Sequence, residues 1–342
     1  MLLQRTNLET EPNDDFYHTP EGLCLAGFSA DDEETYEYLS SLGGGQAEVM
    51  RATFLNGKLW PKSFNLKVGF MSNPARVRRS SLSRLKKTEG YDSLEETIFR
   101  MRPVDAVKKV LQERVAPVIG LTFTFVSNPS QADIRIDFDE RAGAWSYIGT
   151  DATRISKREP TMNLGWLDAQ TIVHEFGHAL GLIHEHQNPR GNPIKWDEEK
   201  LYQYFGARGW DRKTTYHNII RPYSVNSTNG SDFDPDSVML YWFDKNLTKN
   251  GVGTKQNGSF SCTDIEILRN GYPARKNLDQ IPFYRSKQCG GFAGGDVDIG
   301  SVDDGTTTTT PTRPENCPVC PVCPPQMTKR QIVQKCMEYM IE

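Results

Sequence analysis

The segment TIVHEFGHALGLIHEH, residues 171–186, constrains the fold of this 342-residue chain more than any other feature. His174 and His178 are four residues apart, so on an α-helix they lie about one turn apart and only about 40° around the axis. Both imidazoles can therefore face the same metal ion. Gly181 follows where the helix can end, because glycine permits the left-handed conformation that reverses a chain. The reversal lets His184 approach the same point from another side, which predicts a metal site of three histidines.

Three neutral imidazoles leave one coordination position of a zinc ion open for water, as catalytic zinc sites require. Glu175 lies beside the first ligand and can reach water bound to that metal. The pattern H-E-x-x-H-x-x-G-x-x-H fixes five positions in eleven, so we reject the reading in which these are ordinary helix-face residues. A distant glutamate as third ligand would have to be Glu198 or Glu199. His184 makes either unnecessary.

The segment SVMLY, residues 237–241, lies downstream of the histidines. Together with the eleven-residue pattern it resembles the metzincin clan of zinc peptidases, and within that clan the S-x-M-x-Y of the astacin family. The resemblance implies that Met239 lies in a turn beneath the zinc. It also implies that Tyr241 is a fifth zinc ligand that swings away to support the transition state. Taken alone, Tyr241 would be interpreted as a packed aromatic side chain.

The resemblance extends from about residue 59 to about residue 273 and points to microbial and fungal relatives of astacin. The segments that carry it are LWP at 59–61, ADIRIDF at 132–138, GAWSYIG at 143–149, TMNLGWL at 161–167 and FSCTDIEIL at 260–268. It implies an α+β, metzincin-like fold: a twisted mixed β-sheet with an antiparallel edge strand, backing helices, an active-site helix and an irregular lower subdomain. Trp145, Ser146 and Tyr147 are the candidates for the edge strand, which would bind a peptide substrate by strand addition.

The chain departs from the animal astacins in several places. The cysteines of their two disulfides are missing, and Gly143 and Ala144 stand where one would be expected. No propeptide aspartate or cysteine switch is recognised, and Cys24 is interpreted as a buried thiol. Glu185 corresponds to the glutamate that anchors the mature N-terminus of astacin. The remaining histidines, His18, His186 and His217, are interpreted as structural.

Hydrophobic patterns predict the regular elements of the main domain. Strands are expected at 66–71, 121–126, 132–138, 145–148 and 161–167, and helices from Pro103, from Asp168 to about Leu180, at 198–205 and at 263–269. In ADIRIDF the apolar and charged residues alternate, which predicts a half-buried strand. The order of strands and helices favours a mixed sheet backed by helices.

The domain organisation is predicted from composition. Residues 1–57 are acidic and rich in glycine and form an N-terminal extension that could serve as a prosegment, followed by a catalytic domain at 58–285. Within that domain, the basic stretch at 75–87 is interpreted as a solvated loop rather than as a processing site or anion patch. Residues 286–316 have the Gly/Thr/Pro composition of a linker.

Residues 317–342 form a Cys-rich segment with a short amphipathic helix, which could mediate self-association. Its cysteines are Cys317, Cys320, Cys323 and Cys336. Their spacing matches no established metal motif, so redox linkage between chains or simple low complexity is preferred over a metal site.

Charge and composition exclude several function classes. The net charge of −4 gives no signal for nucleic acid, and no apolar run of about 18 residues predicts a membrane span. The first residues lack the regions of a secretory signal, so we expect the protein to stay inside a cell or to leave by a route without one. Cys24, Cys262 and Cys289 permit at most one bridge outside the tail, and we expect mild reduction to leave activity unchanged.

These observations predict a zinc-dependent metalloendopeptidase that acts on a protein or peptide. A zinc ion would polarise the scissile carbonyl and lower the pKa of its bound water. Glu175 would take the water proton and pass it to the leaving amine, and Tyr241 would help to hold the oxyanion. The alternative is a zinc-retaining peptide-binding or structural protein with little turnover. Loss of Glu175 would have indicated that alternative, and Glu175 is present.

Overall fold

The computed structural model describes residues 25–27, 54–55, 57–80, 82–86, 91–225, 228–229, 231–274, 278–285 and 289. The chain divides into two compact units, residues 1–294 and 295–342, and all described residues belong to the first. The predicted C-terminal helix with its cysteines, most of the linker, Cys24 and His18 lie outside the described residues. The proposed self-association through that helix therefore has no structural support.

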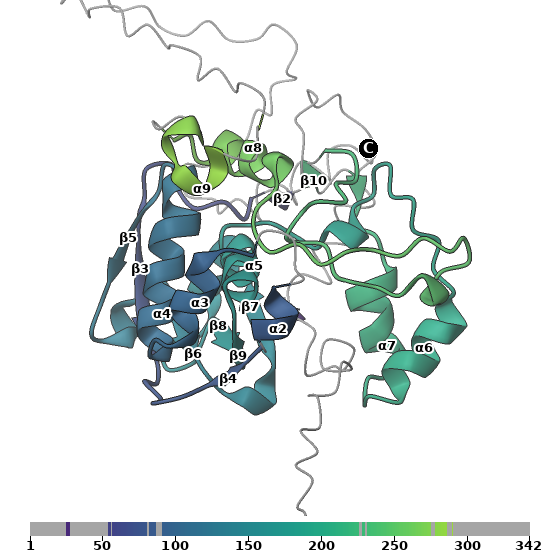
Figure 1. Ribbon diagram of the computed structural model, residues 1–342, viewed down its shortest axis with the longest axis horizontal. Coiled ribbons are helices and arrows are strands. Elements are labelled where there is room, and N and C mark those ends of the chain that lie inside the picture. Colours follow the sequence, from purple (N-terminus) through teal and green to yellow (C-terminus); the bar gives the residue numbers. More distant parts are fainter. Residues whose placement is uncertain are drawn as a thin grey trace, which may run out of the picture. The chain divides into compact units, whose positions relative to one another are not determined.

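A mixed six-stranded sheet organises the first unit (Figure 1). In spatial order its strands are β1 (Leu25–Gly27), β7 (Ala144–Tyr147), β8 (Met162–Leu164), β6 (Ile134–Asp137), β3 (Asn65–Phe70) and β5 (Thr122–Phe125). Strands β8, β6, β3 and β5 run parallel to one another, and β7 runs antiparallel to β8. The predicted mixed sheet with an antiparallel strand is confirmed, and four of the five predicted strands agree with the observed ones to within two residues. The fifth, predicted at 161–167, is divided into β8 (Met162–Leu164) and β9 (Trp166–Leu167), which belong to different sheets.

Strand β7 is not the edge of this sheet. On its outer side it pairs in parallel with β1, with Leu25 opposite Trp145, Ala26 opposite Ser146 and Gly27 opposite Tyr147. The antiparallel edge strand expected from the resemblance is therefore covered by a segment of the N-terminal extension. Such a pairing joins residues about 120 positions apart, and no local pattern in the sequence reports it.

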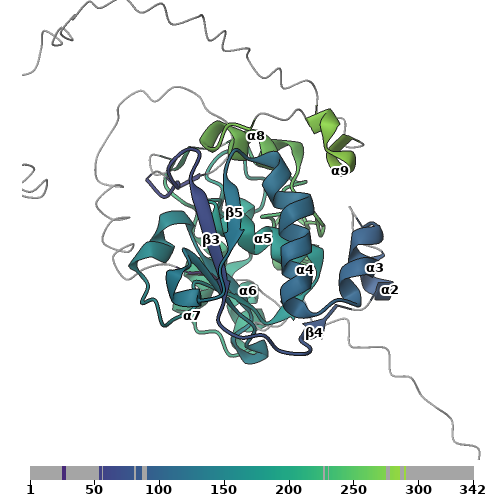
Figure 2. The same ribbon diagram turned by 90° about the vertical axis from the view of Figure 1, so that its left-hand side faces the viewer.

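Helices α4 (Pro103–Val110) and α5 (Ala169–Ala179) cover one face of the sheet (Figure 2). Phe123 of β5 meets Phe176 of α5 edge to face at 6.1 Å, and Phe125 of the same strand lies 5.2 Å from the ammonium of Lys108 in α4. Alternate residues of a strand share a face, so both helices pack on the same side of β5. Helix α4 begins at its proline, as predicted, because a proline at the first helical position costs no hydrogen bond.

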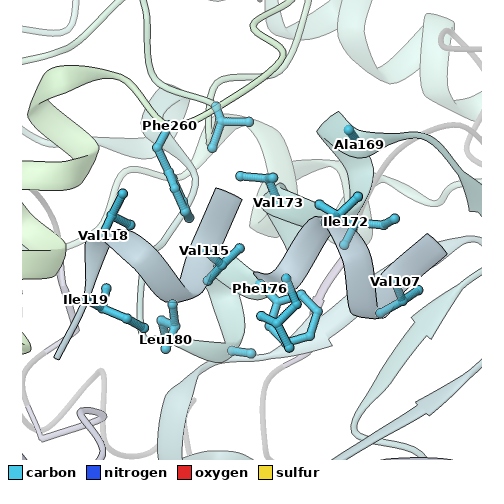
Figure 3. Close-up of a cluster of buried hydrophobic side chains, with 14 of the residues drawn as sticks. Val107, Val115, Val118, Ile119, Ala169, Ile172, Val173, Phe176, Leu180 and Phe260 are labelled. Atoms are coloured by element: carbon cyan, nitrogen blue, oxygen red, sulfur yellow. The ribbon is translucent and has the colours of Figure 1, made fainter. Parts of the chain in front are cut away.

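The hydrophobic core lies between the sheet and these two helices and extends to helix α8 (Cys262–Gly271) (Figure 3). Val107 of α4 and Val115 of the π-helical turn that follows it (Leu111–Val115) lie close to Ile172 and Phe176 of α5. All four side chains are fully buried. Burying a side chain of this size contributes about 1.5–3 kcal/mol, so this cluster holds α5 in one rotational setting.

The chain after His186 has few regular elements, as expected for the irregular lower subdomain. It contains helix α6 (Glu198–Gly206), helix α7 (Arg212–Thr215) and a π-helical turn at Tyr216–Ile220. In Figure 1, α6 and α7 lie on the other side of α5 from α3 (Ser93–Phe99) and α4. A second core fills this part of the molecule. Its buried members are Leu201, Phe205, Ile219, Tyr241, Phe243 and Leu247.

Short elements complete the fold. They are α2 (Leu82–Leu85), α9 (Pro282–Arg285), the pair β4 (Arg78–Arg79) with β9 (Trp166–Leu167), and the pair β2 (Phe54–Leu55) with β10 (Thr228–Asn229). None of the helices in the described part of the chain has the length and hydrophobicity that a bilayer-spanning helix requires.

Two expectations about charged residues are wrong. Strand β6 is not half-buried, because Arg135 has no exposed surface. Its guanidinium donates to the carbonyls of Ile155, Ser156 and Glu159, so a loop covers the strand face that the alternating pattern assigned to solvent. The basic stretch is not simply a solvated loop either. Arg79 pairs in β4 and donates to two carbonyl oxygens at the end of α3 and just beyond it.

The structure also contains a disulfide bond between Cys262, the first residue of α8, and Cys289. It closes a loop of 27 residues, a length at which bridging stabilises a fold by about 3 kcal/mol. The sequence permitted one such bridge but did not predict its pairing. Since it ties α8 to the end of the described chain, the expectation that reduction has no effect is no longer supported.

Candidate metal centre

The three histidines of the eleven-residue motif come together in the interior. His174 and His178 project from α5, and His184 comes from the loop that follows it. Their relative exposures are 7%, 0% and 0%. One nitrogen from each ring lies within 4.8 Å of the other two, and the Nε2 atoms of His178 and His184 are 3.0 Å apart. One metal ion can contact all three rings, as the motif predicts.

The N-terminus of α5 is fixed by two acidic side chains. Asp168 caps the helix, since its carboxylate accepts a hydrogen bond of 2.7 Å from the Thr171 amide. Glu95 of α3 accepts from the Ala169 amide at 2.9 Å. Burial raises the pKa of Glu95 to about 8, and the nearby carboxylate of Asp168 adds to the effect. These contacts and the core fix the position and rotation of α5, and so the directions in which His174 and His178 project from it.

The C-terminus of α5 has the geometry of a Schellman motif. The Gly181 amide donates to the His178 carbonyl at 2.8 Å, and the Leu182 amide donates to the Gly177 carbonyl at 2.9 Å. Gly181 has a φ of +104°, which side-chain-bearing residues rarely adopt. The predicted role of this glycine in reversing the chain is confirmed, and the reversal brings His184 back toward the helix.

Backbone carbonyls orient two of the imidazoles. The Nδ1 of His174 donates to the Val238 carbonyl at 2.8 Å, and the Nδ1 of His178 donates to the Leu182 carbonyl at 2.8 Å. A carbonyl can only accept, so the proton of each neutral ring lies on Nδ1 and the lone pair lies on Nε2. Metal-binding histidines commonly make this contact, because it fixes both the tautomer and the ring orientation.

The electrostatic setting favours neutral rings. Burial lowers the pKa of His174 to about 4, and burial together with the neighbouring imidazoles lowers the pKa values of His178 and His184 well below their usual range. Neutral imidazole is the form that binds a metal. The Nε2 of His174 is also buried and has no hydrogen-bond partner among the described residues. A zinc ion would satisfy it, so the donor set fits zinc.

The turn formed by residues 237–241, here called the Met-turn, lies against the active-site helix. A β-carbon placed on Gly177 would lie 2.5 Å from the Sδ of Met239, so the two segments are in close contact. Met239 is buried, and its carbonyl accepts from the Glu185 amide at 3.0 Å. Met239 thus contacts Gly177, which precedes His184 in the chain, and bonds to Glu185, which follows it.

Tyr241 lies among the histidines. Its ring centroid is 4.3 Å from that of His184, 4.7 Å from that of His186 and 5.8 Å from that of His174. The side chain is 7% exposed. This position agrees with the role implied by the resemblance, and it is also that of a well-packed aromatic residue.

The other predicted site residues lie on elements that adjoin the centre. Glu175 follows His174 on α5 and has no exposed surface. Trp145, Ser146 and Tyr147 lie on β7, which packs next to α5. Ser146 is buried, whereas Trp145 and Tyr147 are partly exposed and contact each other edge to face at 5.8 Å.

The two residues after the third histidine also contact the site: His186, interpreted from the sequence as structural, and Glu185, matched from the sequence to the N-terminal anchor of astacin. His186 donates from Nε2 to the Asn218 carbonyl at 2.9 Å and stacks on Tyr241, so it supports the ring beside the metal site. The carboxylate of Glu185 accepts from Asn188 and from the Asp234 amide, and burial raises its pKa to about 8. The available signal for His186 was its place directly after the second His-Glu pair, His184–Glu185.

The reversal at Gly181 yields a testable prediction. Gly181→Ala forces a side chain into a left-handed conformation and should lower the free energy of unfolding by about 1–3 kcal/mol and weaken zinc binding. Gly206→Ala is the matched control, because Gly206 ends α6 with open space around it and should be neutral or slightly stabilising. Denaturant unfolding and zinc titration of both variants provide the measurement. Equal stabilities would show that the turn does not require glycine.

Comparison with known proteins agrees with this geometry. Residues 120–272 match the family model for Astacin, a peptidase family. Zinc metalloproteinase nas-24 of Caenorhabditis elegans is 30% identical over 142 residues, which cover 40% of this chain and 32% of that protein. This chain thus spans about a third of the length of that curated relative. The solved structure of myroilysin is 29% identical, covers 66% of this chain and 100% of its own, and superposes with a TM-score of 0.51.

The matched region contains all three histidines, Glu175 and the Met-turn. The mixed sheet, the active-site helix and the buried histidine cluster are those that the resemblance implies. Sequence, fold and site therefore agree over residues 120–272, and this part of the chain is that of an astacin-like metzincin.

Proposed function

We propose that this protein is a zinc-dependent metalloendopeptidase that hydrolyses peptide bonds in proteins or peptides. The observation that carries the proposal is the set of three buried, neutral imidazoles, two of them oriented by backbone carbonyls so that Nε2 faces the common point. His174, His178 and His184 would hold the ion. When bound, zinc supplies a Lewis acid that polarises the scissile carbonyl and makes water a stronger nucleophile.

Glu175 is the proposed general base. It follows the first histidine on the same helix, which supports its placement beside the reacting water. A carboxylate there can accept the proton of the attacking water and then deliver it to the leaving amine. Because Glu175 has no exposed surface, bulk water does not compete for that proton.

Tyr241 is the proposed donor to the oxyanion. Its ring packs against His174, His184 and His186, which holds the phenol next to the three proposed zinc ligands. A phenol in this place can donate a hydrogen bond as negative charge develops on the carbonyl oxygen. Such a donor stabilises the transition state more than the bound substrate.

Strand β7 is the proposed binding edge for the substrate backbone, with Trp145, Ser146 and Tyr147 as its contact residues. An extended peptide can add to an open strand edge through main-chain hydrogen bonds. Its inner neighbour is β8, so a peptide would have to use the outer edge. In the full chain that edge is paired with β1.

The N-terminal extension, residues 1–57, is accordingly proposed to act as a prosegment. Leu25–Gly27 pairs along Trp145–Tyr147, and two strands cannot use the same donors and acceptors of β7. The extension therefore competes with the substrate until it is removed or displaced. The catalytic domain proposed to remain spans residues 58–285.

A zinc-retaining peptide-binding or structural protein is the alternative. It would use the same histidines and the same edge of β7 but would not need a general base. The presence of Glu175 directly after the first histidine supports the peptidase over this alternative, because a binding protein would not need that carboxylate.

Glu175→Gln tests the proposed base. The substitution keeps the shape of the side chain and removes the proton acceptor, so zinc should remain bound while kcat falls by about two to four orders of magnitude. Metal analysis and cleavage of a peptide library by the purified variant provide the two measurements. If a zinc-loaded variant retained more than about a tenth of wild-type kcat, Glu175 would not have this role.

Tyr241→Phe separates the oxyanion donor from the packed aromatic ring. Phenylalanine keeps the ring contacts and removes the hydroxyl, so kcat and kcat/KM should fall together by about one to two orders of magnitude with KM nearly unchanged. Steady-state kinetics on one good peptide substrate measures this. Wild-type kcat in a folded, zinc-loaded variant would assign Tyr241 a packing role alone.

Proline substitutions in β1 test the prosegment. Along a strand with a single partner, amide groups point alternately toward the partner and away from it, so one of Leu25→Pro and Ala26→Pro removes a hydrogen bond to β7. The other variant is the matched control. Losing a hydrogen bond worth about 1 kcal/mol should raise the fraction of chains in which the outer edge of β7 is free by about fivefold. The rate of peptide cleavage by the full-length protein should rise by about the same factor. Unchanged activity in both variants would contradict the competition.

A further inference from the structure

Asp264, in the first turn of α8, contacts the Met-turn, which lies more than 20 residues earlier in the chain. Its Oδ1 accepts from the hydroxyl of Ser237 at 2.7 Å, and its Oδ2 accepts from the amide of Val238 at 2.9 Å. The Ser237 hydroxyl oxygen accepts in turn from the Met239 amide at 3.0 Å. One carboxylate therefore holds three consecutive residues of the turn, directly or through a single hydroxyl.

The same turn bonds to a zinc-site histidine. The carbonyl of Val238 accepts the Nδ1 proton of His174 at 2.8 Å, while the amide of Val238 donates to Asp264. A continuous path of hydrogen bonds thus runs from α8 through a single residue of the Met-turn to the imidazole. Moving Val238 would rotate the ring or break its bond to the carbonyl.

Helix capping does not account for these contacts. Asp264 also completes a capping box, in which its Oδ2 accepts from the Ser261 amide at 3.0 Å and its own amide donates to the Ser261 hydroxyl at 2.9 Å. That arrangement needs one acceptor atom of the side chain. The bonds to Ser237 and Val238 are additional, and they are the ones that leave the helix.

Burial of the Asp264 carboxylate has an electrostatic cost. Asp264 is 3% exposed, and burial raises its pKa to about 6, with the carboxylate of Asp234 adding to the effect. The carboxylate of Asp234 in turn accepts from the Ser261 hydroxyl at 2.6 Å. Keeping a charge-bearing group in such a place is unfavourable unless donors surround it, and these donors come mainly from the Met-turn and the helix cap.

We propose that Asp264 is a positioning residue of the metal centre, which holds the Met-turn so that the Val238 carbonyl orients His174 for zinc. The inference rests on the proposed function of His174 as a ligand. Removing an outer hydrogen-bond partner of a metal ligand typically lowers metal affinity about 10- to 100-fold. Asp264 acts through one intervening residue, so the lower end of that range applies.

Zinc affinity of the full-length chain tests the inference, measured by competition with a fluorescent zinc chelator. Asp264→Asn keeps the size of the side chain but offers one oxygen instead of two, and its dissociation constant for zinc should rise about 10-fold. Ser237→Ala removes the hydroxyl, and with it the bonds to Asp264 and to the Met239 amide, but keeps the bond from the Val238 amide to Asp264, so it should give a smaller rise of about threefold. Asp211→Ala is the control for a lost helix cap, because its carboxylate accepts from Thr214 within the first turn of α7.

Unfolding of the zinc-free chains is measured alongside. Positioning predicts weaker zinc binding in the two network variants and unchanged zinc binding in Asp211→Ala, even where the losses of stability are similar. A folded Asp264→Asn chain with the wild-type dissociation constant overturns the inference. If the Asp264→Asn chain does not fold, the Ser237→Ala chain provides the test. A wild-type dissociation constant for zinc in Ser237→Ala would then overturn the inference. A wild-type chain that binds no zinc overturns the proposed function as well, so the two failures are distinguishable.

Discussion

The contacts between ring nitrogens and backbone carbonyls are the interactions on which the metal centre depends. Each Nδ1–H bond to a carbonyl directs the lone pair of Nε2 toward the common point. One carbonyl belongs to Leu182, just beyond the helix, and the other to Val238 in the Met-turn. The helix end and the Met-turn must both be in place for the ligand set to form.

The packing of α5 connects the core to this chemistry. Ile172, Val173 and Phe176 have no exposed surface and face the hydrophobic cluster, so the opposite side of the helix presents His174 and His178. A change in the rotation of α5 would move the core residues and the ligands together. The same residues therefore stabilise the fold and define the site.

The ligand set and the helix that carries it could be predicted from the sequence because their spacing is local. His174, His178, Gly181 and His184 lie within eleven positions, and helix geometry relates them directly. The strands were predicted for the same reason, since each has its own alternating or β-branched pattern. The resemblance to astacins added Met239 and Tyr241, which a local pattern alone does not identify.

The features that could not be predicted depend on contacts between distant segments. The pairing of Leu25–Gly27 with β7, the burial of Arg135 under a loop, and the bridge from Cys262 to Cys289 each join parts of the chain that no periodicity relates. The local sequence around Asp264 indicates only a capping box with Ser261. The contact of its carboxylate with the Met-turn is seen only in the folded chain. Tertiary contacts thus decide how the site is supported and covered.

Metal analysis of the purified full-length chain and of two histidine variants tests whether the three histidines bind zinc. We expect one tightly bound zinc ion in the wild-type chain and its loss in His178→Ala and in His184→Ala, because each variant removes one of three ligands. Full zinc content in both variants would contradict the assignment of the metal centre and of the function built on it.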